Sequence, residues 1–184
     1  MESKKKNINK KKYCVKIPNF IVPDLRTDHA GETGAVFIYK GILLVSKDSE
    51  IIKFSQNHLE TELNHLDTLD QILDDSQKSK LLFLWRILGF LTGLIPSLFG
   101  KNAIYATIFY VESFVEAHYE EQIKLLNKKD NLQLRNLLDN LKNDEVVHKI
   151  DSFKKFNKSK IIHYFWGQII TIGSKIAVNI SKVI

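Results

Sequence analysis

Apolar residues recur along this chain at the spacing of one face of an α-helix, over four long segments separated by short polar breaks. Pro18 and Pro23 interrupt the region before the first segment, so its helix is expected to begin after them. No stretch sustains an alternation of period two, and no β-sheet is expected. The pattern predicts an all-α protein. The four amphipathic helices are expected at about 25–46, 49–75, 101–127 and 130–155.

Two further segments are strongly apolar and predict helices that associate with a membrane. The inserted segment 81–99, LLFLWRILGFLTGLIPSLF, approaches the ~20 residues that span a bilayer. Four of its residues interrupt the run: Arg86, Gly89, Gly93 and Pro96. A crossing here would also place the two halves of the chain on opposite sides of the membrane. An interfacial or re-entrant helix, with the C-terminal segment 161–184 beside it, is therefore favoured over a span. A helix buried in a soluble core is the alternative.

Two Glu-x-x-His motifs, each preceded by a lone glutamate, lie within the four amphipathic helices. Residues three apart lie on one face of a helix, so each motif directs a carboxylate and an imidazole to one point. The separations between lone glutamate and motif, 30 and 33 residues, suit antiparallel neighbours that bring these groups level. Such a set forms the ligands of ferritin-like di-iron carboxylate bundles, so a di-iron site is predicted. The six residues are Glu32, Glu62, His65, Glu112, Glu145 and His148.

Other acidic and histidine residues compete for these roles. Three lie one helical turn from a candidate ligand: His58, Glu116 and Asp144. His118 lies on a different face of its helix from Glu112 and is expected beside the site rather than in it. Asp28 and Asp144 are expected to accept hydrogen bonds from ligand imidazoles, which orients such ligands. Two acidic residues are expected to be solvated: Glu60 and Asp139.

Length and composition narrow the picture further. The 184 residues suit one domain, expected at 24–184. The single cysteine, Cys14, excludes an internal disulfide and an all-thiolate metal site, and it fits a reducing compartment. Much of the net charge of +6 lies in lysines of residues 1–12, so 1–23 is expected to be a disordered basic tail, or one attracted to an anionic membrane. It has neither the apolar region of a signal peptide nor the arginines of a transit peptide. No recognition module follows it, so no nucleic-acid partner is expected.

Four stretches resemble the motifs of the demethoxyubiquinone hydroxylase family, the ubiquinone-biosynthesis branch of the ferritin-like superfamily. In chain order they are DLRTDHAGETGAVFIYKGIL, ETELNHLDTLDQIL, LGFLTGLIPSLFGKNAIYATIFYVESFVEAHYEEQI and LKNDEVVHKID. The resemblance covers residues 24–184, and the iron ligands of the family fall on the six residues named above. Two positions depart from the family pattern. Thr33 stands where tyrosine is common, and Ser113 stands where a second glutamate is usual.

The resemblance implies an oxidoreductase that hydroxylates the ring of a demethoxyubiquinol intermediate, the penultimate step of ubiquinone biosynthesis. One atom of dioxygen would enter the ring and the other would leave as water, at a centre of two iron ions. Electrons would come from NADH or from the quinol itself, and the chain has no Gly-x-Gly-x-x-Gly dinucleotide fingerprint. His118 and Tyr119 match a His-Tyr pair of the family and are expected between substrate and iron.

The implied partners follow from the substrate. A polyprenyl benzoquinol is insoluble in water, which would give the two apolar segments a purpose at the membrane surface. We expect a peripheral protein on the cytoplasmic side of the cell inner membrane, with the matrix side of the mitochondrial inner membrane as the alternative. Homo-oligomers or assemblies with other ubiquinone-biosynthesis enzymes are expected from the resemblance. Two other functions stay open: a ferritin-like iron-storage or ferroxidase protein, and a membrane-interacting scaffold without metal.

Overall fold

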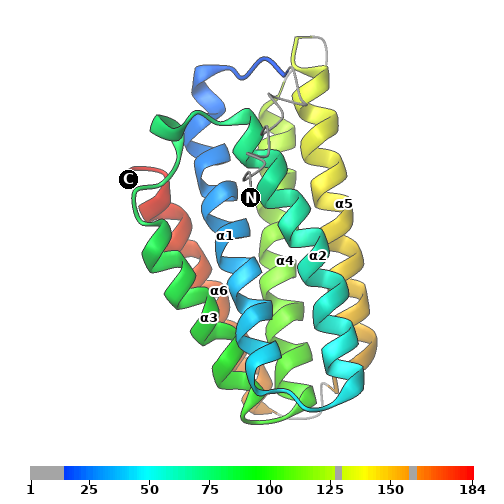
Figure 1. Ribbon diagram of the computed structural model, residues 1–184. Coiled ribbons are helices and arrows are strands. Elements are labelled where there is room, and N and C mark those ends of the chain that lie inside the picture. Colours follow the sequence, from blue (N-terminus) through cyan, green and yellow to red (C-terminus); the bar gives the residue numbers. More distant parts are fainter. Residues whose placement is uncertain (1–14, 127–129, 158–160) are drawn as a thin grey trace, which may run out of the picture.

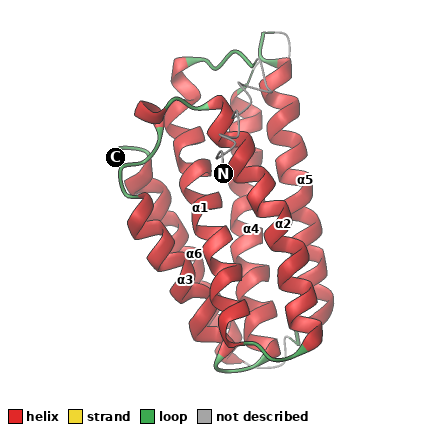
Figure 2. Cartoon of the chain, in the orientation of Figure 1, coloured by secondary structure: helices red, strands yellow, loops and turns green. Residues whose placement is uncertain are grey.

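The computed structural model describes residues 15–126, 130–157 and 161–184, which contain six α-helices, two short 3-10 helices and no strand (Figures 1 and 2). The all-α prediction is confirmed. Four long helices form an antiparallel bundle, and two shorter ones lie along its outside (Figure 1). The bundle helices are α1 Val22–Val45, α2 Ser49–Ile72, α4 Lys101–Leu125 and α5 Leu132–Lys155. The outer helices are α3 Leu82–Ser97 and α6 Ile161–Ser181.

The chain forms two similar halves of three consecutive helices each. In the first half α1 packs against α2 and α3, and in the second half α4 packs against α5 and α6. Segment 81–99, expected as an insertion between two hairpins, forms α3, and α6 occupies the corresponding place in the second half (Figure 1). The repeat suggested by the spacing of the glutamates and histidines therefore extends to the outer helices.

Local chemistry explains where the first two helices begin. α1 starts at Val22, so Pro23 lies in its first turn, where the missing N–H of a proline costs no hydrogen bond. The expectation that this helix begins only after Pro23 was wrong. Asp48 caps α2, because its carboxylate accepts hydrogen bonds from the backbone N–H groups of Glu50 at 3.0 Å and Ile51 at 3.2 Å.

The segment expected as a disordered tail, 1–23, differs from that expectation over its last nine residues. Residues 15–23 include a 3-10 helix, Asn19–Ile21, and the start of α1. Ile21 is fully buried against Leu25 of α1. The lysine-rich part of the tail lies in residues 1–14, outside the described residues.

Two apolar clusters fill the bundle and leave a polar layer between them. Along α1 the first cluster contains Ile21 and Leu25, and the second contains Ile38 and Ile42. Glu32 lies between them. On α2 and α4, residues of one cluster precede the candidate glutamate and residues of the other follow it. On α5, residues of the first cluster precede Glu145, and Phe156 of the second cluster lies just after the helix end. Four helices thus expose carboxylates to one another at the same level, in the middle of an otherwise hydrophobic interior.

Glycine allows α3 to lie against α1 at very short distance. A Cβ added at Gly89 would collide with the backbone of Gly34, and one added at Gly93 would collide with the carbonyl of Ile38. These two glycines, which interrupt the apolar run in the sequence, are therefore needed for helix packing. At Gly31 of α1, by contrast, an added Cβ would meet nothing within 4 Å.

The outer helices present many apolar side chains to solvent. On α3 these include Phe83, Ile87 and Leu91, and on α6 they include Ile172 and Ile176, all between 39% and 75% exposed. None of the helices in the described ranges combines the length and the hydrophobicity needed to cross a bilayer. The two outer helices therefore leave a broad apolar surface next to the bundle.

Candidate metal centre

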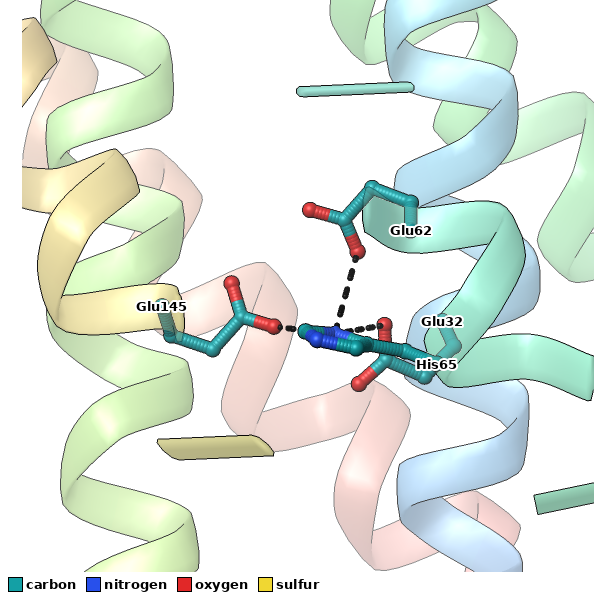
Figure 3. A group of neighbouring side chains, drawn as sticks. All are labelled: Glu32, Glu62, His65 and Glu145. Carbon is teal, nitrogen blue, oxygen red and sulfur yellow. Dashed lines mark ion pairs between the residues drawn. The ribbon is translucent and has the colours of Figure 1, made fainter. Parts of the chain in front are cut away.

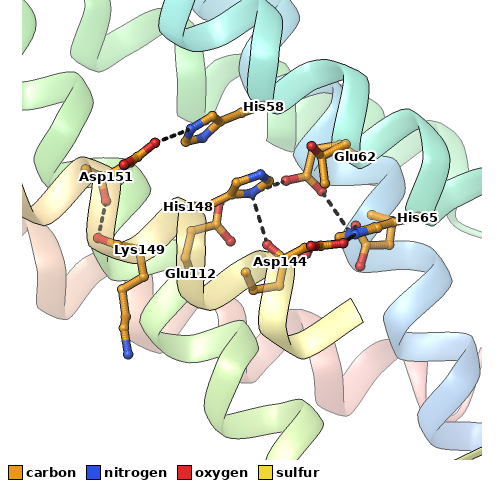
Figure 4. A network of polar contacts seen from close by, with 12 residues as sticks. His58, Glu62, His65, Glu112, Asp144, His148, Lys149 and Asp151 are labelled. Carbon is orange, nitrogen blue, oxygen red and sulfur yellow. Dashed lines mark hydrogen bonds and ion pairs between the residues drawn. The ribbon is translucent and has the colours of Figure 1, made fainter. Parts of the chain in front are cut away.

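The six candidate ligands lie at the same level of the bundle, with one or two residues from each bundle helix. All six are buried, with at most 3% of each residue exposed. Figure 3 shows one histidine of α2 lying among carboxylates from three helices. Figure 4 shows the second histidine, from α5, beside the carboxylates of α2 and α4. The contributors are Glu32 from α1, Glu62 and His65 from α2, Glu112 from α4, and Glu145 and His148 from α5.

These side chains form two overlapping groups. Glu32 and His65 belong to the first group only, and Glu112 and His148 to the second only, whereas Glu62 and Glu145 belong to both. Within each group, one ligand atom from each residue lies within 4.8 Å of the others. Two adjacent cations that share two carboxylates would fit this arrangement. The helix spacing predicted from the sequence therefore brings all six residues together.

Both histidines turn their Nδ1 atoms into the centre. His65 Nδ1 lies 2.9 Å from Glu145 Oε1 and 3.6 Å from Glu32 Oε2. His148 Nδ1 lies 3.0 Å from Glu62 Oε1. The Nε2 atom of His65 faces the opposite way and lies 3.1 Å from Oδ2 of Asp144, which thereby holds the ring in place. Asp144 thus takes the orienting role expected for it.

The electrostatics of the centre show an excess of buried negative charge. Burial and the neighbouring carboxylates raise the pKa values of Glu62 and Glu112 well above the usual range. Burial opposes ionisation of Glu145 too, but His148 and His65 bring its pKa down to about 2. Burial alone would lower the pKa of His65, but the close carboxylates of Glu145 and Glu32 raise it to about 12. Four carboxylates facing two imidazoles would be stabilised by added positive charge.

Unpaired atoms in the centre agree with metal binding. Both carboxylate oxygens of Glu62 and of Glu145, and Nδ1 of His65 and of His148, make no hydrogen bond of good geometry although they are fully buried. Leaving so many buried polar atoms unsatisfied is costly unless another group binds them. Carboxylate oxygen and imidazole nitrogen are suitable donors for iron and similar divalent metals. The residues present therefore fit a pair of such ions.

Two tyrosines hold the outer carboxylates. Tyr119 donates from its hydroxyl to Glu32 Oε1 at 2.6 Å, and Tyr39 donates to Glu112 Oε1 at 3.2 Å. The hydroxyl of Tyr39 also lies 3.1 Å from Nδ1 of His58, whose ring stacks on His148 with centroids 4.1 Å apart. Sequence reasoning missed Tyr39. Its place seven residues after Glu32, on the same face of α1, was the available signal.

The competing residues lie outside the centre. Glu116 pairs with Lys149, and Asp139 pairs with Lys142 at 2.9 Å. Glu60 is exposed. His58 packs beside the centre and lies 3.6 Å from Asp151, which is about half exposed (Figure 4). These contacts match the solvated surface role expected for Glu60 and Asp139, and they leave His58 next to a ligand rather than among the ligands.

The two residues that depart from the family pattern turn away from the carboxylates. The hydroxyl of Thr33 donates to the carbonyl of His29 at 2.8 Å, and the hydroxyl of Ser113 donates to the carbonyl of Phe109 at 2.6 Å. Both bonds join a side chain to the preceding turn of its own helix. Neither substitution removes a group from the six candidate ligands.

An apolar cavity of about 340 Å³ opens onto the centre. It lies between α1, α3, α4 and α6, and four carboxylates of the centre line its inner end. The outer helices contribute to its wall through Leu88 and Thr92 of α3 and Ile169 of α6. His118 also lines this cavity, with Nε2 2.7 Å from the hydroxyl of Thr27, and within the described part of the chain it makes no hydrogen bond or ion pair with a candidate ligand. Ligand-sized cavities with few polar groups are typical of small-molecule sites.

A four-helix bundle that buries four glutamates and two histidines in two overlapping groups defines the ferritin-like carboxylate proteins with paired metal ions. A model of the family described as "Ubiquinone biosynthesis protein COQ7" matches residues 19–181. The chain therefore belongs to this family.

Curated relatives agree over most of the chain. The 3-demethoxyubiquinol 3-hydroxylase of Rhodospirillum rubrum is 30% identical over 161 residues, which cover 86% of this chain and 76% of the relative. The NADPH-dependent 3-demethoxyubiquinone 3-hydroxylase, mitochondrial, of Dictyostelium discoideum is 26% identical over 161 residues, 85% of this chain and 74% of the relative. The human protein of the same name is 28% identical over 163 residues, 86% and 75% of the two chains.

Proposed function

We propose that this protein is a 3-demethoxyubiquinol 3-hydroxylase, an oxidoreductase of ubiquinone biosynthesis that adds a hydroxyl group to the ring of its quinol substrate. One observation carries the proposal: an apolar cavity ends on a buried centre of four carboxylates and two imidazoles. Hydroxylase relatives from bacteria and eukaryotes align with most of the chain. The resident cofactor would be two iron ions, and the co-substrate would be dioxygen.

Each of the six ligands would have a defined place. Glu32 and His65 would hold one ion and Glu112 and His148 the other, and Glu62 and Glu145, which belong to both groups, would contribute to holding both. When bound, the iron pair would reduce dioxygen and supply the oxygen atom that enters the ring.

The chain's own residues position the ligands and shelter the ring. Tyr119 and Tyr39 fix the orientation of Glu32 and Glu112, and Asp144 fixes that of His65. The apolar walls of the cavity would hold the quinol ring against the centre and exclude water.

The substrate and the electron donor extend the proposal. The tail of a polyprenyl quinol would leave the cavity between α3 and α6, which both line it, and the exposed apolar side chains of these helices would lie against the membrane surface. Relatives carry "NADPH-dependent" in their names, so a nicotinamide nucleotide is the proposed reductant. The proposed location is peripheral, on the cytoplasmic side of a bacterial inner membrane or the matrix side of the mitochondrial one.

The ferritin-like alternative has less support from this molecule. An iron store needs a path for hydrated ions, whereas the cavity that reaches the carboxylates is walled mainly by apolar side chains. A scaffold without metal would have no use for four buried glutamates, whose burial without a partner is costly.

Iron analysis and quinol turnover on one preparation test the proposal. We expect about two iron ions per chain after anaerobic purification, and we expect a gain of one oxygen atom, by mass spectrometry, in a quinol with a short isoprene tail. Incorporation of label from ¹⁸O₂ and not from labelled water is the expected origin of that atom. A protein without iron, or an iron-loaded protein that leaves the quinol unchanged while a reductant is consumed, would contradict the proposal.

A further inference from the structure

Asp28 is a buried carboxyl that the metal centre does not use. It lies on α1, one helical turn before Glu32, and its side chain is 1% exposed. The amide of Gln122 donates to Oδ1 at 2.6 Å. Oδ2 has no hydrogen-bond partner among the described residues. Asp28 was expected to orient a ligand imidazole, but its partner is this amide, so that expectation was wrong.

The unpaired oxygen belongs to a polar patch in an otherwise apolar cavity. Thr27, Asp28 and His118 line the cavity side by side. The hydroxyl of Thr27 donates to the carbonyl of Asp24 at 2.6 Å, so the 2.7 Å contact with His118 has the histidine Nε2–H as donor. This histidine proton is therefore directed at Thr27 and leaves Oδ2 of Asp28 unsatisfied. A buried carboxyl oxygen without a partner is costly unless a ligand supplies one.

The position of Asp28 suits a ring substrate. Four residues along a helix correspond to a rise of about 6 Å, so Asp28 and Glu32 lie roughly that far apart along α1. Both line the same cavity. One six-membered ring with hydroxyl groups at opposite corners can extend from the level of Asp28 to the level of the carboxylate centre. The Gln122 amide holds Oδ1, which fixes the direction in which Oδ2 points.

We propose that Oδ2 of Asp28 hydrogen-bonds a ring hydroxyl of the quinol and thereby determines which ring carbon faces the metal centre. This inference rests on the proposed function and adds a positioning residue to it. The apolar walls bind the ring without regard to its orientation, whereas a single hydrogen bond at one end selects one orientation. A site that is built to pair with a hydroxyl group discriminates strongly against an analogue without it.

The test compares two ligands on two proteins. The ligands are the demethoxyquinol with one isoprene unit and its ring dimethyl ether, in which both ring hydroxyl hydrogens are replaced by methyl groups. Binding to the iron-loaded protein is measured without oxygen, from the quenching of Trp85 and Trp166 fluorescence, because both tryptophans line the cavity. In Asp28→Ala the affinity for the quinol should fall about ten- to a hundredfold, and the affinity for the ether should stay within about twofold. Thr92→Val, which removes another hydroxyl group from the cavity wall, should leave the ratio of the two affinities unchanged.

Three results would separate the possibilities. Equal affinity of wild type and Asp28→Ala for the quinol, or an equal loss for both ligands, would overturn the inference while leaving the hydroxylase proposal in place. No saturable binding of the quinol to the wild type would instead count against the proposed function itself. Should Asp28→Ala not fold, the double variant Asp28→Ala/Gln122→Leu leaves no unpaired partner, and the same fall in the affinity ratio is expected.

Discussion

Replacing Tyr119 with phenylalanine removes a single hydroxyl group from the edge of the metal centre. Tyr119 is 1% exposed, and its hydroxyl donates to Glu32 Oε1 over 2.6 Å. Phenylalanine fills nearly the same space, so the surrounding core should not collapse or expand. The loss is therefore confined to one hydrogen bond, which orients a carboxylate expected to hold metal.

The size of the effect follows from the type of bond. A hydrogen bond to a charged group contributes about 1.5–3 kcal/mol. This range corresponds to about a ten- to hundredfold change in an equilibrium constant, and outer partners of metal ligands have effects of this order. Affinity for Fe²⁺ should fall by that factor at the position that uses Glu32 and His65. The position that uses Glu112 and His148 should be affected less.

The assay is an anaerobic titration of Fe²⁺ against a competing chelator, with thermal melting of the metal-free protein as a check on folding. Tyr110→Phe is the matched control, because Tyr110 contacts aromatic rings and no carboxylate of the centre in the described contacts. We expect its two affinities to match those of the wild type. Equal metal affinity in Tyr119→Phe and Tyr110→Phe would refute the assignment of Glu32 as a ligand held by Tyr119.

Three further tests, which use five substitutions, address other parts of the account. Glu112→Gln should abolish most hydroxylation of the quinol, whereas Glu60→Gln should leave turnover within about twofold, because only Glu112 is buried in the centre. An equal loss of turnover in the two variants would show that the assigned helix face is wrong. Gly93→Ala should lower the Tm by several degrees, since overpacking against α1 costs about 1–3 kcal/mol. Gly31→Ala should instead raise the Tm by about 2–4 °C, because alanine has a higher helix propensity than glycine. A melting scan in which Gly93→Ala and Gly31→Ala shift the Tm in the same direction would contradict the packing argument. Ile172→Glu, on the exposed face of α6, should lower recovery on zwitterionic vesicles about tenfold or more without changing the Tm; unchanged sedimentation would place membrane contact elsewhere.

The bundle and its six converging side chains could be predicted because their positions follow directly from helix periodicity. A glutamate and a histidine three residues apart must share a face, and the separation between Glu32 and Glu62 fits one helical hairpin. The two overlapping groups of side chains in the folded chain agree with this predicted convergence. The two apolar clusters on either side of them were found only in the structure.

Other features depend on contacts between distant parts of the chain, and periodicity does not reveal them. Asp28 was assigned to a ligand imidazole, but Gln122 on α4, 94 residues away, takes its Oδ1. Gly31 and Gly93 look alike in sequence, yet only Gly93 meets the backbone of a neighbouring helix. Pro23 was expected to precede the helix, but it lies in the first turn of α1. A proline is tolerated in the first turn and breaks a helix further along, and the sequence pattern did not show which case applies. Each outcome depends on which helices become neighbours.

The central claim is that six side chains of this chain hold two metal ions side by side. Anomalous diffraction at the iron absorption edge, from crystals loaded anaerobically with Fe²⁺, tests it most directly. We predict two peaks within the bundle, both flanked by Glu62 and Glu145, with His65 next to one and His148 next to the other. A single peak, or peaks only at the protein surface while these six residues remain unligated, would contradict the account.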